Sequence, residues 1–542
     1  MRRQRICKRL SVVARVCARA GLAVAAATAA TVATAGAAGA ALAADLPYSE
    51  AVAARFAEPA VRYDTPGLRA GRDSFTSNPE LAASLQALAA APKGPRRVVA
   101  GRSQAGLAIE ALHFSSGPGR PAVLLVGQQH GDEPAGAEAL LALAQQLASA
   151  ELAPLLQKID VVVLPRANPD GAELGARRAA NGLDINRDHL LLRTPEAQAQ
   201  GQLMREFKPV VVVDAHEHTV VGRYLQKFGA IQRHDLLLQY AMTANLPPAL
   251  TRASEEWFRQ PMLRALNEAG LTAEWYYTNP ANPTDMRLSM GGAQPDTARN
   301  VHGLKNTISM LLEGRGVGIG RLHLQRRVHS HVVAMKSILA SAAARADALV
   351  ALRREADAQI AASACQGNVV VLAAQTAEQR ELLMLDPVTG ADKTVSVQWF
   401  SSLQLRPLIT RPRPCGYWLA AGADDAVMRL QALGVQVHRL RAATQLQAEA
   451  WRETSRVEGA RPDVRGAVDD GHAVRLVRVA TDAVGLAVPA GSWYVSLAQP
   501  LAQLAVAALE PDSPNSYFAN HVLADLAAAA RVTAVPAAEA LP

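Results

Sequence analysis

The chain has 542 residues, of which 50% are hydrophobic and 19% are charged. This length exceeds one ordinary domain, and so apolar a composition excludes a disordered protein. The formal net charge of +8 is unevenly distributed, because seven of the 56 basic residues precede Ala44 in a stretch without acidic residues. The remaining 49 basic and 48 acidic residues nearly balance, so we expect no nucleic-acid partner.

The first 43 residues have the pattern of a secretory signal peptide. Their basic residues precede an apolar stretch of small residues over 21–43, which closes with Ala41-Leu42-Ala43. The stretch is also long enough for a retained membrane anchor, but its small residues and A-x-A ending favour cleavage. We therefore expect no membrane span in the mature chain, and a location in the periplasm of a Gram-negative bacterium or outside the cell.

Two cysteines, Cys365 and Cys415, remain after the expected cleavage, because Cys7 and Cys17 lie within the signal peptide. In an oxidising compartment this pair predicts a disulfide. The bond would close a loop of about 50 residues and stabilise the fold by roughly 4 kcal/mol, provided that the two Cα atoms approach within about 7 Å. Two buried free thiols are the alternative.

The first half of the chain alternates apolar strands with helices. A helix is expected over 78–91, followed by strands over 96–103, 107–116 and 121–127, a helix over 133–150, strands over 158–165 and 208–215, a strand over 306–316 and a long helix over 323–358. Continuous apolar strands that alternate with helices predict a mostly parallel sheet covered on both faces.

Beyond residue 358 the pattern changes to short alternating strands. These are expected over 366–375, 393–400, 415–421, 435–440, 473–480 and 492–499, with one helix over 424–434. The alanine-rich sequence after Leu526 predicts a terminal helix with a frayed end. We therefore expect a signal peptide at 1–43, a catalytic domain at 44–358, a strand-rich α+β accessory domain at 359–530 and a flexible tail at 531–542.

Three side chains at the ends of the apolar strands form a candidate metal site. His130 and Glu133 lie three residues apart where a strand opens into a helix, and His216 ends a later strand. Open α/β sheets bind ligands at this edge, and two histidines with one glutamate form a zinc site with an open fourth position. The H-x-x-E pair alone could arise by chance, His218 is an alternative ligand, and Asp214 could be an ordinary strand-end acid.

Further polar residues could complete a catalytic centre. Glu313 follows the apolar run 308–312, so a buried strand presents its carboxylate as a general base would require, although a salt bridge with Arg315 is an alternative. A loop with several arginines leaves the second core strand. This loop could be merely solvated, but guanidinium groups also suit the binding of a carboxylate.

Seven motifs over about residues 98–339 resemble those of the zinc carboxypeptidase family, the carboxypeptidase A-like metallopeptidases. In chain order they are GRSQAG, HGDE, NPDG, RR, LDINRD, DAHEH and MLLEGRG. The resemblance implies an α/β/α sandwich around a mixed eight-stranded sheet, and one Zn²⁺ per chain bound by His130, Glu133 and His216. It also implies a hydrolase that removes C-terminal residues from peptides.

The resemblance also implies roles for residues around the metal. Glu313 takes the place of the general base, and Arg177 that of the oxyanion-stabilising arginine, for which the adjacent Arg178 is an alternative. Asn186 and Arg187 match the pair that binds the terminal carboxylate of the substrate. Asp184 matches the acid that orients the first histidine ligand.

The sequence departs from the digestive carboxypeptidases at Asp132, where those enzymes carry arginine. The HGDE form is similar to murein-peptide amidases of the same family, so cleavage of diaminopimelate-containing wall peptides is an alternative activity. A non-catalytic periplasmic peptide-binding protein is another, although all the expected ligands are present. Tyr276 and Tyr277 are candidates for the tyrosine that covers the substrate, or they form an aromatic core pair.

Overall fold

The computed structural model describes residues 47–468 and 471–541. The predicted signal peptide lies outside these residues. The described residues form one compact unit. None of the described helices is both long and apolar enough to cross a lipid bilayer.

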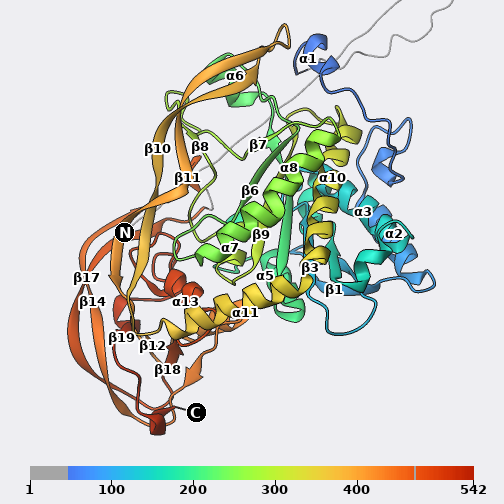
Figure 1. The fold of residues 1–542 in the computed structure, drawn as a ribbon. Coiled ribbons are helices and arrows are strands. Elements are labelled where there is room, and N and C mark those ends of the chain that lie inside the picture. Colours follow the sequence, from blue (N-terminus) through green and yellow to red (C-terminus); the bar gives the residue numbers. More distant parts are fainter. Residues whose placement is uncertain (1–46, 469–470, 542) are drawn as a thin grey trace, which may run out of the picture. The chain divides into compact units, whose positions relative to one another are not determined.

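A mixed eight-stranded sheet forms the centre of the first half, in the order β1-β2-β4-β3-β5-β9-β6-β7 (Figure 1). The four inner strands β4, β3, β5 and β9 are parallel, whereas β1, β2 and β6 run antiparallel to their neighbours on the β4 and β9 sides. The strands are β1 Arg96–Arg102, β2 Ala108–Phe114, β3 Ala122–Gly127, β4 Asp160–Leu164, β5 Val211–Thr219, β6 Leu236–Tyr240, β7 Ala273–Trp275 and β9 Ile308–Val317. The predicted mixed sheet of eight strands is confirmed.

Alternate residues of the inner strands enter two separate cores, one on each face of the sheet. In β3, for example, Val123 and Leu125 join the core that contains α3 and α10, whereas Leu124 and Val126 join the core that contains α5. Successive side chains of a strand point to opposite faces, so a strand with both faces covered must be apolar throughout. The helices are α1 Glu50–Ala54, α2 Asn78–Ala90, α3 Ala135–Ala148, α4 Pro169–Leu174, α5 Pro195–Phe207, α6 Gly222–Phe228, α7 Pro248–Ala253, α8 Gln260–Glu268, α9 Ala298–Gly303 and α10 Leu324–Ala344.

The predicted long helix over 323–358 is wrong, because the structure divides it into two. Helix α10 ends at Ala344, and α11 Ala346–Ala362 follows after Arg345, whose φ of −123° and ψ of 23° interrupt the helix. Helix α10 packs on α3 and α8, whereas α11 packs on α7 and on a later helix, α13 Ala502–Leu509. The break therefore lets one continuous sequence pack against two groups of helices.

The remainder of the chain is rich in strands, and part of it joins the first core. A long hairpin of β10 and β11 pairs through β11 with β8 Leu288–Ser289, and Val397 and Trp399 of β11 lie in the same core cluster as α3 and α10 (Figure 1). A six-stranded sheet has the order β13-β18-β12-β19-β14-β17. The elements are β10 Asn368–Leu385, β11 Asp392–Pro412, β12 Gly416–Leu419, α12 Asp424–Leu433, β13 His438–Arg439, β14 Thr444–Gly459, β15 Arg461–Asp463, β16 Gly466–Val468, β17 Val474–Val488, β18 Trp493–Ser496, α13 Ala502–Leu509 and β19 Ala529–Val532. A division into domains at residue 358 stays a prediction.

The expected helix after Leu526 is also wrong. Residues Ala529–Val532 form β19, which lies between β12 and β14 in the six-stranded sheet and is buried along its length. Alanine has a high helix propensity, but pairing with strands on both sides outweighs this local preference.

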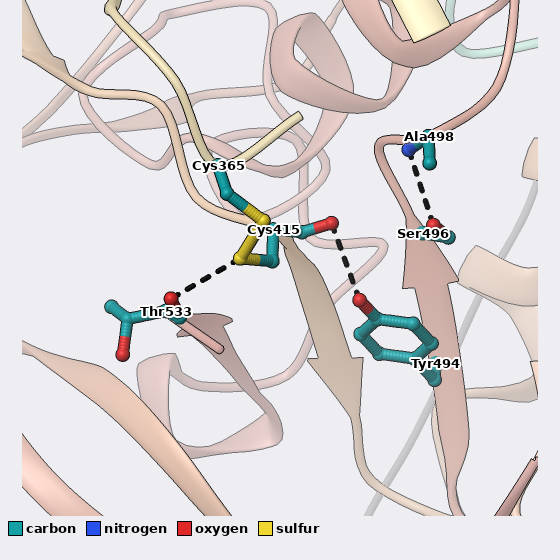
Figure 2. Close-up of a disulfide and its surroundings, with 6 residues drawn as sticks. All are labelled: Cys365, Cys415, Tyr494, Ser496, Ala498 and Thr533. Carbon is teal, nitrogen blue, oxygen red and sulfur yellow. Dashed lines mark hydrogen bonds between the residues drawn. A yellow bond between two sulfur atoms is a disulfide. The ribbon is translucent and has the colours of Figure 1, made fainter. Parts of the chain in front are cut away.

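A disulfide joins Cys365, just before β10, to Cys415, just before β12 (Figure 2). The backbone of Cys415 is held on two sides. Its N–H donates to the carbonyl oxygen of Val532 at 2.8 Å, and its carbonyl oxygen accepts from the Tyr494 hydroxyl at 3.2 Å. The predicted disulfide is confirmed, and the alternative of two free thiols is wrong.

We predict that replacing both cysteines with serine (Cys365→Ser with Cys415→Ser) lowers the free energy of unfolding by about 4 kcal/mol. The reason is that the bond closes a loop across a sequence separation of 50 residues and so restricts the unfolded chain. Denaturant titration of wild type and variant measures the difference. Reduced wild type is the control and should match the variant; equal stability of the oxidised wild type and the variant would contradict the prediction.

Candidate metal centre

Three side chains converge at the carboxyl ends of two neighbouring parallel strands. His130 and Glu133 lie in the loop between β3 and α3, and His216 lies near the end of β5. The two carboxylate oxygens of Glu133 lie 2.8 Å from Nδ1 of His130 and 2.7 Å from Nδ1 of His216. The two Nδ1 atoms are 3.0 Å apart, and all three side chains are buried. The structure therefore brings together the three predicted ligands.

Close backbone contacts fix the loop that carries two of these residues. A Cβ atom at Gly131 would lie 1.9 Å from the carbonyl carbon of Gly171, so only glycine fits where the two loops meet. The fully buried Asn168 joins them: its Oδ1 accepts from the Gly171 N–H at 2.9 Å and its Nδ2 donates to the Gln129 carbonyl at 3.2 Å. The HGDE and NPDG motifs thus hold each other in place.

Each histidine ring has a carboxylate at its second nitrogen. Nε2 of His130 lies 3.1 Å from Asp184, and Nε2 of His216 lies 2.8 Å from Asp214. A proton on Nε2 that is shared with the carboxylate leaves the Nδ1 lone pair available for a cation, which is the usual arrangement around metal-binding histidines. The contact of Asp184 was expected. The contact of Asp214 was not predicted, because Asp214 could equally be an ordinary acid at a strand end. Its position two residues before His216 places both side chains on the same face of the strand, which was an available signal.

The charges of this cluster suit a cation. Burial alone would raise the pKa of Glu133, but the positive charges of His130 and His216 outweigh burial and hold that pKa well below its usual value. Burial lowers the pKa of His216, but Asp214 and Glu133 outweigh it and raise that pKa well above the usual value. Buried carboxylates around two imidazoles can be balanced by protons or by a divalent metal. The residues present therefore fit a metal ion.

Glu313 lies beside the cluster on the neighbouring strand. It is the register partner of His216 in the parallel pair β5 and β9, and it is only 7% exposed. Burial raises its pKa to about 7, with opposing contributions from His216, which lowers the pKa, and Glu133, which raises it. Among the described ion pairs none joins Glu313 to Arg315, whose guanidinium lies 4.0 Å from the centroid of the Phe56 ring. The carboxylate is therefore available for proton transfer.

Arg177 contacts the candidate ligands directly. Its Nη1 lies 3.2 Å from Glu133, and its Nη2 lies 3.0 Å from Asp184. The adjacent Arg178 instead donates to the carbonyl oxygen of Gly182 at 3.0 Å. The sequence left Arg177 and Arg178 as alternatives for the oxyanion-stabilising arginine, and Arg177 is the one that contacts a candidate metal ligand.

Asn186 and Arg187 lie next to the cluster, but the partner of Arg187 was not expected. The Asn186 Oδ1 accepts from the Ala298 N–H at 2.8 Å, and its Nδ2 lies 3.1 Å from Nε2 of His216. Arg187 Nε donates to Oδ2 of Asp463 at 2.8 Å. Burial lowers the pKa of Arg187, but nearby carboxylates, first among them Asp463, outweigh burial and raise it.

Asp463 belongs to a hairpin of β15 and β16 in the strand-rich part of the chain. The hairpin is tied to the site by the buried Arg461, whose Nη2 donates to the Arg187 carbonyl at 3.0 Å, and by the Arg465 carbonyl, which accepts from Ala281 at 2.7 Å. Asp463 follows Arg187 by 276 residues, and no local motif marks it. Reasoning from the sequence therefore missed this hairpin.

Two other expected candidates lie elsewhere. His218 is not in the metal-binding group; its Nδ1 lies 3.2 Å from the Thr219 carbonyl, and burial lowers its pKa to about 3. Tyr277 is fully buried and packs against Trp399, so it belongs to the core. The Tyr276 hydroxyl, by contrast, lies 3.4 Å from Nη2 of Arg465 on the hairpin.

Comparisons with known proteins find similarity to carboxypeptidases. Residues 81–217 match the zinc carboxypeptidase family. Carboxypeptidase 2 of Trichophyton equinum is 30% identical over 404 residues, which cover 74% of this chain and 74% of that protein, and Carboxypeptidase 2 of Trichophyton rubrum is 30% identical over 398 residues, which cover 73% and 72%. This coverage exceeds the span 44–358, so the similarity includes part of the remaining sequence. A solved structure of a putative carboxypeptidase from Burkholderia mallei is 17% identical, with a TM-score of 0.40 over 49% of this chain and 68% of that chain.

We predict that Asp214→Asn weakens metal binding about 10- to 100-fold, because an amide no longer fixes the protonation of the His216 ring. Competition with a chromogenic chelator measures the zinc affinity. Asp160→Asn is the matched control, since Asp160 also lies beside a histidine, 3.2 Å from His113, but at the opposite end of the parallel strands. Equal zinc affinities of wild type and the two variants would show that Asp214 does not support the metal site.

Proposed function

The chain belongs to the zinc carboxypeptidase family and is a metallopeptidase of that type, and we propose that it removes single residues from the free C-termini of peptides. The placement of Glu313 carries the proposal. This buried carboxylate, with a pKa of about 7, lies on the strand next to His216 and makes no ion pair among the described residues. A general base must be close to the metal without being one of its ligands.

His130, Glu133 and His216 would hold one Zn²⁺ per chain. When bound by two neutral histidines and one carboxylate, zinc supplies a Lewis acid that polarises a carbonyl group and lowers the pKa of water. The outer carboxylates of Asp184 and Asp214 hold the two imidazole rings in the orientation that this binding requires.

Proton transfer is assigned to Glu313 and charge stabilisation to Arg177. Glu313 accepts a proton from the attacking water and later donates it to the leaving amine, and a pKa near 7 suits both steps at neutral pH. Arg177 lies against Glu133 with its side chain 25% exposed, so its guanidinium can stabilise negative charge that develops on the substrate carbonyl oxygen.

Binding of the terminal carboxylate is assigned to Asn186 and Arg187. Asp463 holds Nε of Arg187, and the Asn186 carbonyl accepts from Nη1 at 2.7 Å. Within the described chain, Nη2 of Arg187 has no hydrogen-bond partner. Asp463 therefore acts as a positioning residue that fixes the guanidinium while leaving one of its edges for the substrate.

Export is proposed on the basis of the N-terminal sequence, with support from the disulfide. Disulfides form and persist in oxidising compartments such as the bacterial periplasm or the extracellular space. Cleavage after Ala43 would make Ala44 the first residue of the mature protein, and N-terminal sequencing of the exported protein measures this directly. A mature chain that still begins with residues of the basic segment would contradict cleavage.

We predict that the zinc-loaded wild type shortens linear peptides one residue at a time, and that Glu313→Gln lowers the rate by about 10² to 10⁴, the usual contribution of a general base. Mass spectrometry of a pooled digest identifies each bond cleaved. The variant should retain its zinc content, which separates loss of the base from loss of the metal. Cleavage confined to diaminopimelate-containing wall peptides would contradict carboxypeptidase action and indicate an amidase.

The same digest tests the role of Arg187. Wild type should act on a peptide with a free C-terminus and leave its amidated counterpart intact, because only the former offers a carboxylate to the guanidinium. Arg187→Ala should lose this difference. If the variant kept the full preference for the free C-terminus, another group would have to bind the carboxylate.

A further inference from the structure

Two arginines outside the expected motifs lie within electrostatic reach of Glu313. The charge of Arg465 lowers the pKa of Glu313, and the charge of Glu313 raises the pKa of Arg299. Tyr276 connects the two: its hydroxyl lies 3.4 Å from Nη2 of Arg465, and a Cβ atom at Gly291 would lie 3.0 Å from Cδ1 of Tyr276 and 3.1 Å from Nη2 of Arg299. Both guanidinium groups therefore lie near the same tyrosine side chain.

Arg299, on α9, is buried without a carboxylate partner. It is 3% exposed, its Nη2 donates to the Gly292 carbonyl at 2.9 Å, and its Nε lies 3.4 Å from Oδ1 of Asn300. Within the described residues its Nη1 has no hydrogen-bond partner, and no ion pair includes Arg299. Burial lowers its pKa to about 10, and the charges of other groups, among them Glu313, raise it only in part.

Buried arginines of this protein differ in how completely their nitrogens are hydrogen-bonded. Arg166 donates from all three nitrogens, to Gln128, Asn78 and the Thr76 carbonyl, at 2.6 to 2.7 Å. Arg315 donates from Nη1 to the Gln232 carbonyl and packs over the ring of Phe56, while its Nε and Nη2 have no hydrogen-bond partner among the described residues. A buried guanidinium without such partners is costly unless a ligand supplies an anion.

Arg465, at the turn of the β15–β16 hairpin, provides a second incompletely satisfied cation. Its Nε is buried, and among the described residues that atom has no hydrogen-bond partner. The hairpin is held in place by Arg461 and by the contact of the Arg465 carbonyl with Ala281, so the position of Arg465 is fixed by the fold.

Both arginines belong to the side of the site where the leaving residue would bind. Arg187, assigned above to the terminal carboxylate, shares Asp463 with Arg465: one carboxylate oxygen accepts from Arg187 Nε and the other from the Arg465 N–H, each at 2.8 Å. Asn186 accepts from the N–H of Ala298, which directly precedes Arg299. Asp463 compensates one of these three positive charges. The other two guanidinium groups make no ion pair among the described residues, so they suit a second carboxylate of the substrate, beyond the terminal one assigned to Arg187.

We propose that Arg299 and Arg465 bind the side-chain carboxylate of the residue that is removed, so that the enzyme prefers peptides ending in an acidic residue. This inference rests on the carboxypeptidase activity proposed above. Two guanidinium groups can bind a carboxylate through several charge-assisted hydrogen bonds, and a neutral or cationic side chain would leave them buried and unpaired.

The test uses the full mature chain loaded with zinc and four peptides that differ only in a C-terminal Glu, Gln, Leu or Lys. We expect kcat/KM for the Glu peptide to exceed that for the Gln peptide about tenfold or more. In Arg299→Gln and Arg465→Gln this ratio should fall towards one. Arg465 is partly exposed, so its variant keeps the test valid if Arg299→Gln does not fold.

Arg452→Gln is the matched control, because it makes the same substitution at an exposed ion pair with Asp482 in the strand-rich region. Its Glu-to-Gln ratio should equal that of wild type. A readout independent of turnover is the rise in melting temperature on addition of glutarate. We expect this rise for wild type and Arg452→Gln, and a smaller rise for Arg299→Gln and Arg465→Gln.

The outcomes separate this inference from the activity on which it rests. Equal rates on the Glu and Gln peptides, or a preference for Leu or Lys, would leave the carboxypeptidase activity intact and overturn the proposed binding of an acidic side chain by Arg299 and Arg465. Failure to cleave any of the four peptides, with zinc bound and the fold intact, would overturn the proposed activity. The glutarate shift would then decide alone whether the two arginines form an anion pocket, and no shift would overturn it.

Discussion

The pairing of β5 with β9 is the constraint on which the site depends. The two strands are parallel neighbours, and their register makes His216 and Glu313 direct partners on one face of the sheet. Neighbouring strands lie about 4.8 Å apart, so this pairing holds a carboxylate close to a metal ligand without making it a ligand itself. On the other side of β5, strand β3 leads into the loop that carries His130 and Glu133. The hydrogen bonds of the sheet thus set the distances between the candidate metal ligands and Glu313.

Burial gives the centre its electrostatic character. The buried Glu133 and Asp214 and the largely buried Asp184 surround two imidazole rings, and Arg177 contacts Glu133 and Asp184. Removing so many carboxylates from water is unfavourable unless positive charge accompanies them. A metal ion that binds the folded state and not the unfolded chain would therefore couple occupancy of the site to stability. The pH dependence of metal binding is set by the protons that the metal must displace from its ligands.

Much of the fold and of the metal centre could be predicted from the sequence, because the responsible signals are local. A strand covered on both faces must be apolar throughout, and a strand followed by H-x-x-E places both ligands at one edge. The misses involve tertiary contacts. Strand β14 was not among the strands expected from the sequence, because its second half is exposed and polar and so lacks an apolar face. The alanines of β19 pair with strands on both sides, and α10 ends at Arg345, without a glycine or proline to mark its end. Asp463 and Arg465 lie on a hairpin whose position at the site is not predicted by any motif in the sequence.

The contact between Arg187 and Asp463 also has a consequence for the order of events during synthesis. The aspartate follows the arginine by 276 residues, and ribosomes add about 5 to 20 residues per second. Arg187 therefore leaves the ribosome roughly 15 to 50 s before its partner does. For most of this interval, once His216 has also emerged, the nascent chain contains all three candidate metal ligands, but its substrate-binding arginine has not yet been fixed. Completion of the binding site is thus delayed until nearly the whole polypeptide has emerged.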